Sequence, residues 1–127
     1  MAGHSDPIRL KPIEWIASSR SDLAAFPPQV RREIGHALYM AQAGEKSPLA
    51  KPLRGFGGAG VLEIVEDSDG NAYRAVYTVK FARVVFVLHS FQKKSKRGTA
   101  TPQSEIDLVV KRLKDARALY QELFGAE

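Results

Sequence analysis

With 127 residues, 44% hydrophobic and 26% charged, the chain is long enough for one domain with a buried core and is typical of a soluble globular protein. The absence of cysteine excludes disulfides, thiolate catalysis and cysteine-based zinc sites, and no apolar run approaches the ~20 residues of a membrane span. The N-terminus lacks the apolar core of a signal peptide, so we expect a cytoplasmic protein whose net charge of +5 attracts an anionic partner.

The first third of the chain predicts one strand followed by two helices. After a loose tail over residues 1–7, apolar alternation in residues 12–18 predicts a short strand. Residues 19–26 begin with a capping-box pattern and predict a short helix. Pro28 suits the first turn of a second helix, which Gly44 is expected to end. Apolar residues repeat there with helical spacing, namely Val30, Ile34, Ala37, Leu38 and Ala41.

The remainder predicts three strands and a last helix. Residues 47–60 form a connector rich in proline and glycine, and strands are predicted over residues 61–67, 71–79 and 82–91. The last strand is apolar on both faces and is therefore expected at the centre of the sheet. Thr101 is expected to cap the final helix. An apolar stripe follows it: Ile106, Val109, Val110, Leu113, Ala116 and Tyr120.

These elements predict a single α+β domain over residues 1–127, in the order β-α-α-β-β-β-α. Helices are expected to cover one face of a mostly antiparallel sheet. The two N-terminal helices would pack on that face, with the C-terminal helix completing the fold. The other face is expected to remain open for a ligand.

Two local patterns imitate ligand-binding motifs. Residues 55–60 satisfy G-x-G-x-x-G, but the following segment is strand-like, so no helix N-terminus would hold a pyrophosphate and a loop is favoured. Residues 67–71 resemble the start of a calcium loop, but Thr78 stands where the bidentate glutamate is needed. A hairpin turn at Asp69-Gly70 is favoured instead. Metal-ligand spacing is absent, so no metal is expected.

The segment from residue 83 to residue 97 holds five cations and no acid. An apolar strand ending in His89 leads into the basic run, which is either an exposed loop or a contact for nucleic acid, and we favour the second. His89 is either structural or a group that moves protons near neutral pH.

Arg74 lies inside a strand, on the face opposite Tyr73 and Tyr77. Two interpretations of Arg74 stay open: an ion pair with Glu63 or Glu66, or a contact to phosphate. For the two tyrosines, packing is favoured over base stacking.

Three segments together resemble a known family: AKPLRGFGGAGVLEI, YRAVYTV and VLHSFQKKSKRGTATPQSEID. The chain is similar, from about Pro12 to Tyr120, to the phage-derived, HigB-like branch of the RelE/ParE toxin superfamily. The resemblance implies a RelE-like fold and the toxin of a type II toxin–antitoxin system. Such toxins cleave mRNA in the ribosomal A site without metal or other cofactor, and their antitoxin is a small protein, often of the helix-turn-helix type.

The expected chemistry is attack of the RNA 2′-oxygen on the adjacent phosphate, which needs proton transfer and stabilisation of a dianionic centre. We expect Arg74, His89, Lys93 and Lys94 to form the catalytic set. Either His89 or one of the lysines would move protons. RNA backbone contacts are expected from Lys51, Arg54, Lys96 and Arg97.

The sequence departs from relatives that carry a catalytic aromatic residue or histidine near the C-terminus. Here the chain ends in a helix, with Tyr120 on its apolar stripe. Two alternatives therefore remain: a ParE-like toxin that poisons gyrase without cutting RNA, and an inactive prophage protein that only binds an antitoxin. The dense group of cations favours the endoribonuclease.

Overall fold

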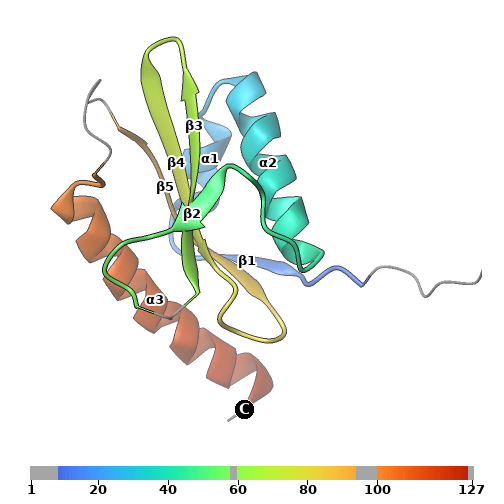
Figure 1. The fold of residues 1–127 in the computed structure, drawn as a ribbon. Helices are drawn as coiled ribbons and strands as arrows, with labels where there is room; N and C mark the ends of the chain where they lie inside the picture. The colour runs from blue at the N-terminus through green and yellow to red at the C-terminus, as the bar shows by residue number, and fades with distance from the viewer. Residues whose placement is uncertain (1–8, 58–59, 94–99, 126–127) are drawn as a thin grey trace, which may run out of the picture.

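The protein is a mixed sheet between two layers of helices. The computed structural model describes residues 9–57, 60–93 and 100–125. Its elements in chain order are β1 (Ile13–Trp15), α1 (Ser19–Ala24), α2 (Pro28–Gln42), β2 (Ala50–Pro52), β3 (Val61–Ser68), β4 (Asn71–Thr78), β5 (Val85–Lys93) and α3 (Gln103–Phe124) (Figure 1). The strand order is β1-β5-β4-β3-β2, and only β1 and β5 run parallel among these neighbours. The predicted α+β class and mostly antiparallel sheet are confirmed.

A tight hairpin joins β3 and β4, two antiparallel strands of 8 residues each. Asp69 and Gly70 both have positive φ angles, 51° and 78°. Positive φ at both central residues is what a two-residue hairpin turn of type I′ requires, because its twist matches that of the strands. The hairpin interpretation of residues 67–71 is therefore confirmed.

The layer on one side of the sheet is built from α1 and α2. The predicted helical stripe of α2 is buried there, and Gly44 follows the helix with a φ of 84°. Tyr73 and Tyr77 are buried in the same core, which confirms packing rather than base stacking for these two rings. In residues 9–57, 60–93 and 100–125, no helix is long and apolar enough to cross a membrane.

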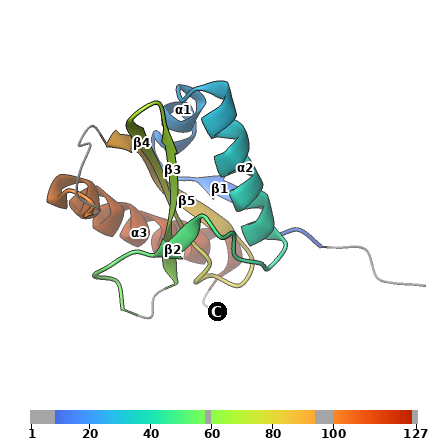
Figure 2. The same cartoon turned by 45° about the horizontal axis from the view of Figure 1, so that its top comes forward.

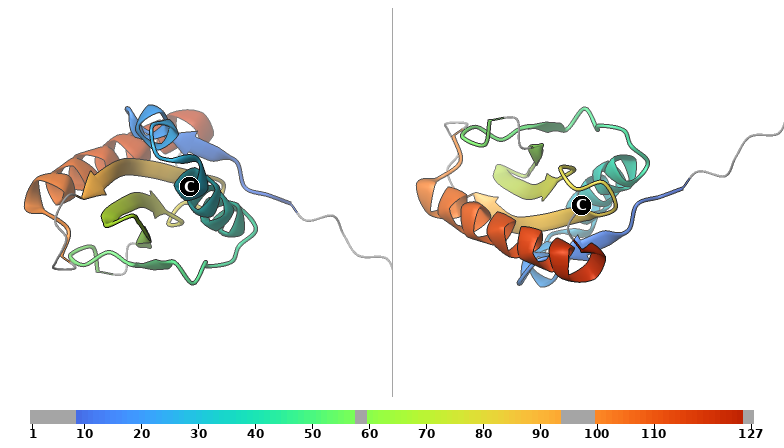
Figure 3. Two further views of the ribbon diagram at one scale, coloured as in Figure 1. Left: turned by 90° about the horizontal axis from the view of Figure 1, so that it is seen from above. Right: turned by 90° about the horizontal axis from the view of Figure 1, so that it is seen from below.

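The opposite face of the sheet is covered in part by α3, so the expectation of an open face was wrong. Successive residues of β5 alternate between the two layers: Val87 packs with α2, whereas Phe86 and Leu88 pack with α3. Figures 2 and 3 show the sheet lying between α2 and α3. The predicted apolar stripe of α3 packs here except for Val110, which is 41% exposed. The stripe needs this burial, because an amphipathic helix is stabilised mainly by packing its apolar face.

Three local expectations also need correction. The connector over residues 47–60 contains the short strand β2, which pairs with β3. Thr101 does not cap α3, because its hydroxyl donates to the buried Glu63 carboxylate instead. Ser19 is the first residue of α1 rather than its cap, and its hydroxyl donates to the carbonyl of Val87 on β5.

Burial of Tyr77 makes the stability of the fold sensitive to alkaline pH. Removal from water disfavours the phenolate and raises the pKa of Tyr77 from 10.0 to about 12. Because the folded pKa is the higher one, the stabilisation is complete below the unfolded pKa and is lost as pH rises through the folded value. We expect the free energy of unfolding, measured by urea denaturation, to fall less between about pH 10 and pH 12 in Tyr77→Phe than in the wild type. Tyr39→Phe, at an exposed tyrosine, is the matched control and should follow the wild type.

Candidate functional site

A β-bulge in β5 directs the end of that strand toward α3. Val76 pairs with His89 and Tyr77 pairs with Val87, so Leu88 is the extra residue between them. Without the bulge, strict alternation would place His89 on the α2 side with Val87. With it, His89 and Phe91 face α3, as the contacts of His89 and the packing of Phe91 show. Lys93, two residues further along the strand, shares this face.

The same face of β4 presents Arg74. Arg74 pairs with Phe91 across the ladder, and Ala72 pairs with Lys93, so Arg74 and Lys93 are diagonal neighbours on neighbouring strands. Side chains related in this way are close enough for long residues to act on one group. The structure thus brings two of the predicted catalytic residues together.

Arg74 is held by contacts to one of its terminal nitrogens. Nη1 donates to Asp67 Oδ1 at 3.2 Å and to the backbone carbonyl of Tyr73 at 3.1 Å. The Arg74 side chain is only 7% exposed, whereas that of Asp67 is 69% exposed. The ion-pair interpretation of Arg74 was right in kind, but the partner is Asp67 rather than Glu63 or Glu66.

The other guanidinium nitrogens of Arg74 keep access to solvent. Nε and Nη2 make no hydrogen bond within the described residues. Among those residues Ser90 Oγ is the only buried side-chain nitrogen or oxygen without a partner, so the two Arg74 nitrogens are not sealed in the core. A guanidinium with free donors matches the geometry of a phosphate.

His89 is enclosed by two side chains of α3. Arg112 Nη1 lies 2.9 Å from His89 Nδ1, and Glu105 Oε1 lies 2.6 Å from His89 Nε2. Because a guanidinium can only donate, Nδ1 must accept, and the ring proton is on Nε2, which donates to Glu105. The imidazole also stacks on Phe91, with ring centroids 4.9 Å apart. Both nitrogens of His89 are therefore engaged.

Glu63 is the most deeply buried acid on this face, at 1% exposed. Its Oε2 accepts a hydrogen bond of 2.8 Å from Thr101 Oγ1. Glu63 pairs with Val76 on one side and with Lys51 on the other, so Lys51 of the exposed strand β2 belongs to the same face. The contact with Thr101 ties the segment before α3 to the middle of the sheet.

Of the remaining residues predicted for catalysis or RNA binding, Lys93 and Arg54 lie within the described residues and the others do not. Lys93 is buried at the end of β5, and Arg54 is exposed just after β2. Lys94, Lys96 and Arg97 lie outside the described residues, so their roles stay predictions.

The expectation of cations without acids holds along the sequence but not in space. Asp67 on β3 pairs with Arg74, and Glu105 on α3 pairs with His89. Both acids come from elements other than β5. The site is therefore a network in which Asp67 neutralises Arg74 and Glu105 accepts the ring proton of a neutral His89, and the exposed Asp67 is easily displaced from its cation.

Sequence reasoning missed Glu105 and Arg112 as site residues. Arg112 is not part of the apolar stripe of its helix, yet it reaches the carbonyl of Leu88 and His89. Glu105 and Arg112 are seven residues apart, which is two helical turns and places both on one face. That spacing could have revealed the pair, but nothing local indicated that His89 lies between them.

This arrangement can bind and polarise a phosphodiester. Arg74 offers free donors, Lys93 adds a second cation, and the sheet holds both in fixed positions. Fixed cations stabilise charge that develops in a transition state without reorganising. Within residues 9–57, 60–93 and 100–125, no group of three or more His, Asp or Glu side chains could hold a metal ion.

Comparisons with known proteins bear on the family and the fold of the chain. Residues 21–114 match the family model described as "Phage derived protein Gp49-like (DUF891)". Among solved structures, a doubly substituted E. coli toxin RelE in the free state is 22% identical, covering 82% of this chain and 98% of that chain with a TM-score of 0.56. The RelBE2 toxin–antitoxin complex from Mycobacterium tuberculosis is 21% identical, covering 72% of this chain and 100% of that chain with a TM-score of 0.45. Comparison with curated proteins gives no match. The likeness to E. coli RelE shows a RelE-like fold, as the resemblance implied.

Proposed function

The chain belongs to the family of phage-derived Gp49-like proteins, and from this premise we propose that it is the toxin of a type II toxin–antitoxin system that cleaves messenger RNA on the ribosome. The HigB-like branch is part of this proposal. The observation that carries it is Arg74: a nearly buried guanidinium with free donors, whose acid partner Asp67 is exposed. A phosphate can take the place of Asp67 without leaving Arg74 unpaired in the interior.

The proposed reaction uses the RNA's own nucleophile. The 2′-oxygen attacks the adjacent phosphorus, the bond to the 5′-oxygen breaks, and a 2′,3′-cyclic phosphate remains on the upstream fragment. Arg74 and Lys93 stabilise the extra negative charge at phosphorus as the new bond forms. Lys94 is assigned to the same step, while Lys51, Arg54, Lys96 and Arg97 are assigned to the RNA backbone.

Proton transfer is assigned to the lysines rather than to His89: one lysine in its neutral form accepts the proton of the 2′-hydroxyl, and a charged lysine donates a proton to the 5′-oxygen. One proton must leave the 2′-hydroxyl and another must reach the departing 5′-oxygen. His89 can take part only if Arg112 or Glu105 first releases one of its ring nitrogens. We therefore assign His89 to positioning: it holds α3 against β5 beside the cations.

The proposed partner of the toxin is a cognate antitoxin, a small protein of the helix-turn-helix type encoded beside it. The net charge of +5 suits an acidic segment of such a partner. An antitoxin that lies over Arg74 and Lys93 would exclude RNA from both cations at once.

Two reporter messages that differ only in the start codon test this function. After induction of the toxin, we expect growth arrest with cuts inside the translated reporter and none inside the reporter without a start codon. Equal cutting of both reporters would show that cleavage does not depend on translation, and the ribosome would then no longer be part of the proposed function. Arrest with intact messages and trapped gyrase–DNA complexes would replace the endoribonuclease with the gyrase-poison alternative.

A further inference from the structure

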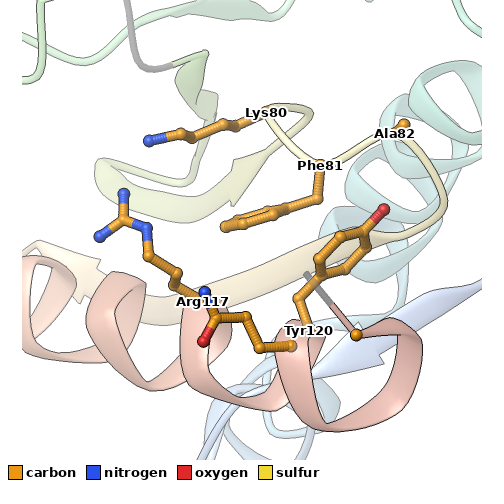
Figure 4. A pocket seen from close by; sticks show the side chains of 7 residues that line it. Lys80, Phe81, Ala82, Arg117 and Tyr120 are labelled. Carbon is orange, nitrogen blue, oxygen red and sulfur yellow. The ribbon is translucent and has the colours of Figure 1, made fainter. Parts of the chain in front are cut away.

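A pocket outside the candidate site lies between the β4–β5 connection and the C-terminal half of α3. It encloses about 400 Å³, within the range of small-ligand sites. Lys80, Phe81 and Ala82 line it from the connection, and Arg117, Tyr120 and Gln121 line it from α3, with Gly125 beyond. Figure 4 shows Lys80 and Arg117 extending to the same side of the Phe81 ring.

The two cations of this pocket are not neutralised. Across the described parts of the chain, the side chains of Lys80 and Arg117 have no hydrogen-bond or ion-pair partner. No acid is among the residues that line the pocket. Two unpaired cations that converge on one cavity repel each other, and an anion between them relieves that repulsion.

The pocket lies on the α3 side of the sheet, beyond the end of β4 that follows Arg74 along the chain. Thr78 is four residues from Arg74 along β4, roughly 13 Å at the usual rise of a strand. Val61 pairs with Thr78, and the backbone nitrogen of Leu53 donates to the carbonyl of Val61, so Arg54 is anchored at the same end of the sheet as Lys80. Exposed cations therefore continue from the candidate site to the pocket.

We propose that Lys80 and Arg117 bind a backbone phosphate of the RNA strand whose scissile phosphate lies at Arg74. The separation places this phosphate on a different nucleotide from the one that is cut. Phe81 and Tyr120 are buried, so their rings form walls rather than stacking surfaces, and the contact is made by charge. Recognition here is consequently independent of base identity.

This inference rests on the proposed function, which identifies the bound strand as RNA. An assay of RNA binding without cleavage tests the inference separately. The probe is a fluorescent single-stranded 12-mer RNA with 2′-O-methyl groups, which cannot be cut because the nucleophile is blocked. Its affinity is measured by anisotropy at several salt concentrations for the wild type and for the double variant Lys80→Ala/Arg117→Ala. The matched control is Arg32→Ala/Lys46→Ala, which removes one exposed arginine and one exposed lysine on α2 and just beyond it.

Loss of phosphate contacts lowers the slope of log affinity against log salt by about 0.7 per contact for a single strand. We expect the slope to fall by about 1.4 in Lys80→Ala/Arg117→Ala, equally for two RNAs of unrelated sequence, and by much less in the control. Equal slopes in the two double variants, or binding of inorganic phosphate alone with no change in the RNA slope, would overturn the inference. If the expected fall occurs but induced toxin cuts no message, the pocket contact stands and the proposed function fails.

Discussion

Replacing Arg74 with alanine is expected to lower the rate of mRNA cleavage by about 10²–10³-fold, the cost of removing one fixed group that stabilises transition-state charge. The reason is geometric as well as electrostatic. The guanidinium is held by Asp67 and the Tyr73 carbonyl, and its other nitrogens make no hydrogen bond within the described residues. The measurement is the cleavage rate of a translated message in a reconstituted translation reaction with the purified protein.

Two variants separate this role of Arg74 from a structural one. Arg74→Lys keeps the charge but loses the planar set of donors, so it should restore only part of the rate. Asp67→Asn removes the acid that competes with phosphate, and we expect cleavage at the wild-type rate or faster. If Asp67→Asn were as inactive as Arg74→Ala, the ion pair itself would be what the activity needs, and Arg74 would not be a phosphate ligand. Circular dichroism and thermal unfolding would check that each variant is folded.

Local chemistry accounts for most of the elements that the sequence predicted. Helical spacing from Val30 to Ala41 predicted α2, and Asp69-Gly70 predicted the turn between β3 and β4, because both depend on neighbours within a few residues. The strand β2 has three residues and no pattern of its own. It forms only because it can pair with β3 at the edge of the sheet, which is a tertiary contact rather than a local preference.

The arrangement of the candidate site depended on contacts that no local pattern encodes. Alternation alone would send His89 to the α2 side, and the bulge at Leu88 reverses that direction. The partners of His89 lie 16 and 23 residues away along the chain, and the partner of Thr101 lies 38 residues away. Residue types therefore predicted that cations would gather here, whereas the acids that balance them became visible only in the fold.

The enclosure of His89 leads to the second large effect. Replacing His89 with alanine is expected to reduce the free energy of unfolding by about 2–4 kcal/mol, because Arg112 and Glu105 lose a buried partner and Phe91 loses a stacked ring. His89→Gln keeps one donor and one acceptor and should restore part of this stability. Urea denaturation measures both changes.

The activity of the folded His89 variants then decides between positioning and proton transfer. A positioning role predicts that His89→Gln retains the cleavage rate within about 10-fold with an unchanged pH profile, since a general acid or base contributes typically 10²–10⁴-fold. Arg112→Ala breaks the same enclosure from the other side, so it should reproduce the loss of stability, with a coupling energy between the two positions of about 0.5–3 kcal/mol in a double-mutant cycle. A stable His89→Gln protein that has lost 10²-fold or more in rate, together with one limb of its pH profile, would instead make His89 the proton carrier. In that case Arg112 would have to release Nδ1, or Glu105 release Nε2, each time RNA binds, and α3 would loosen from the sheet during the reaction rather than staying fixed.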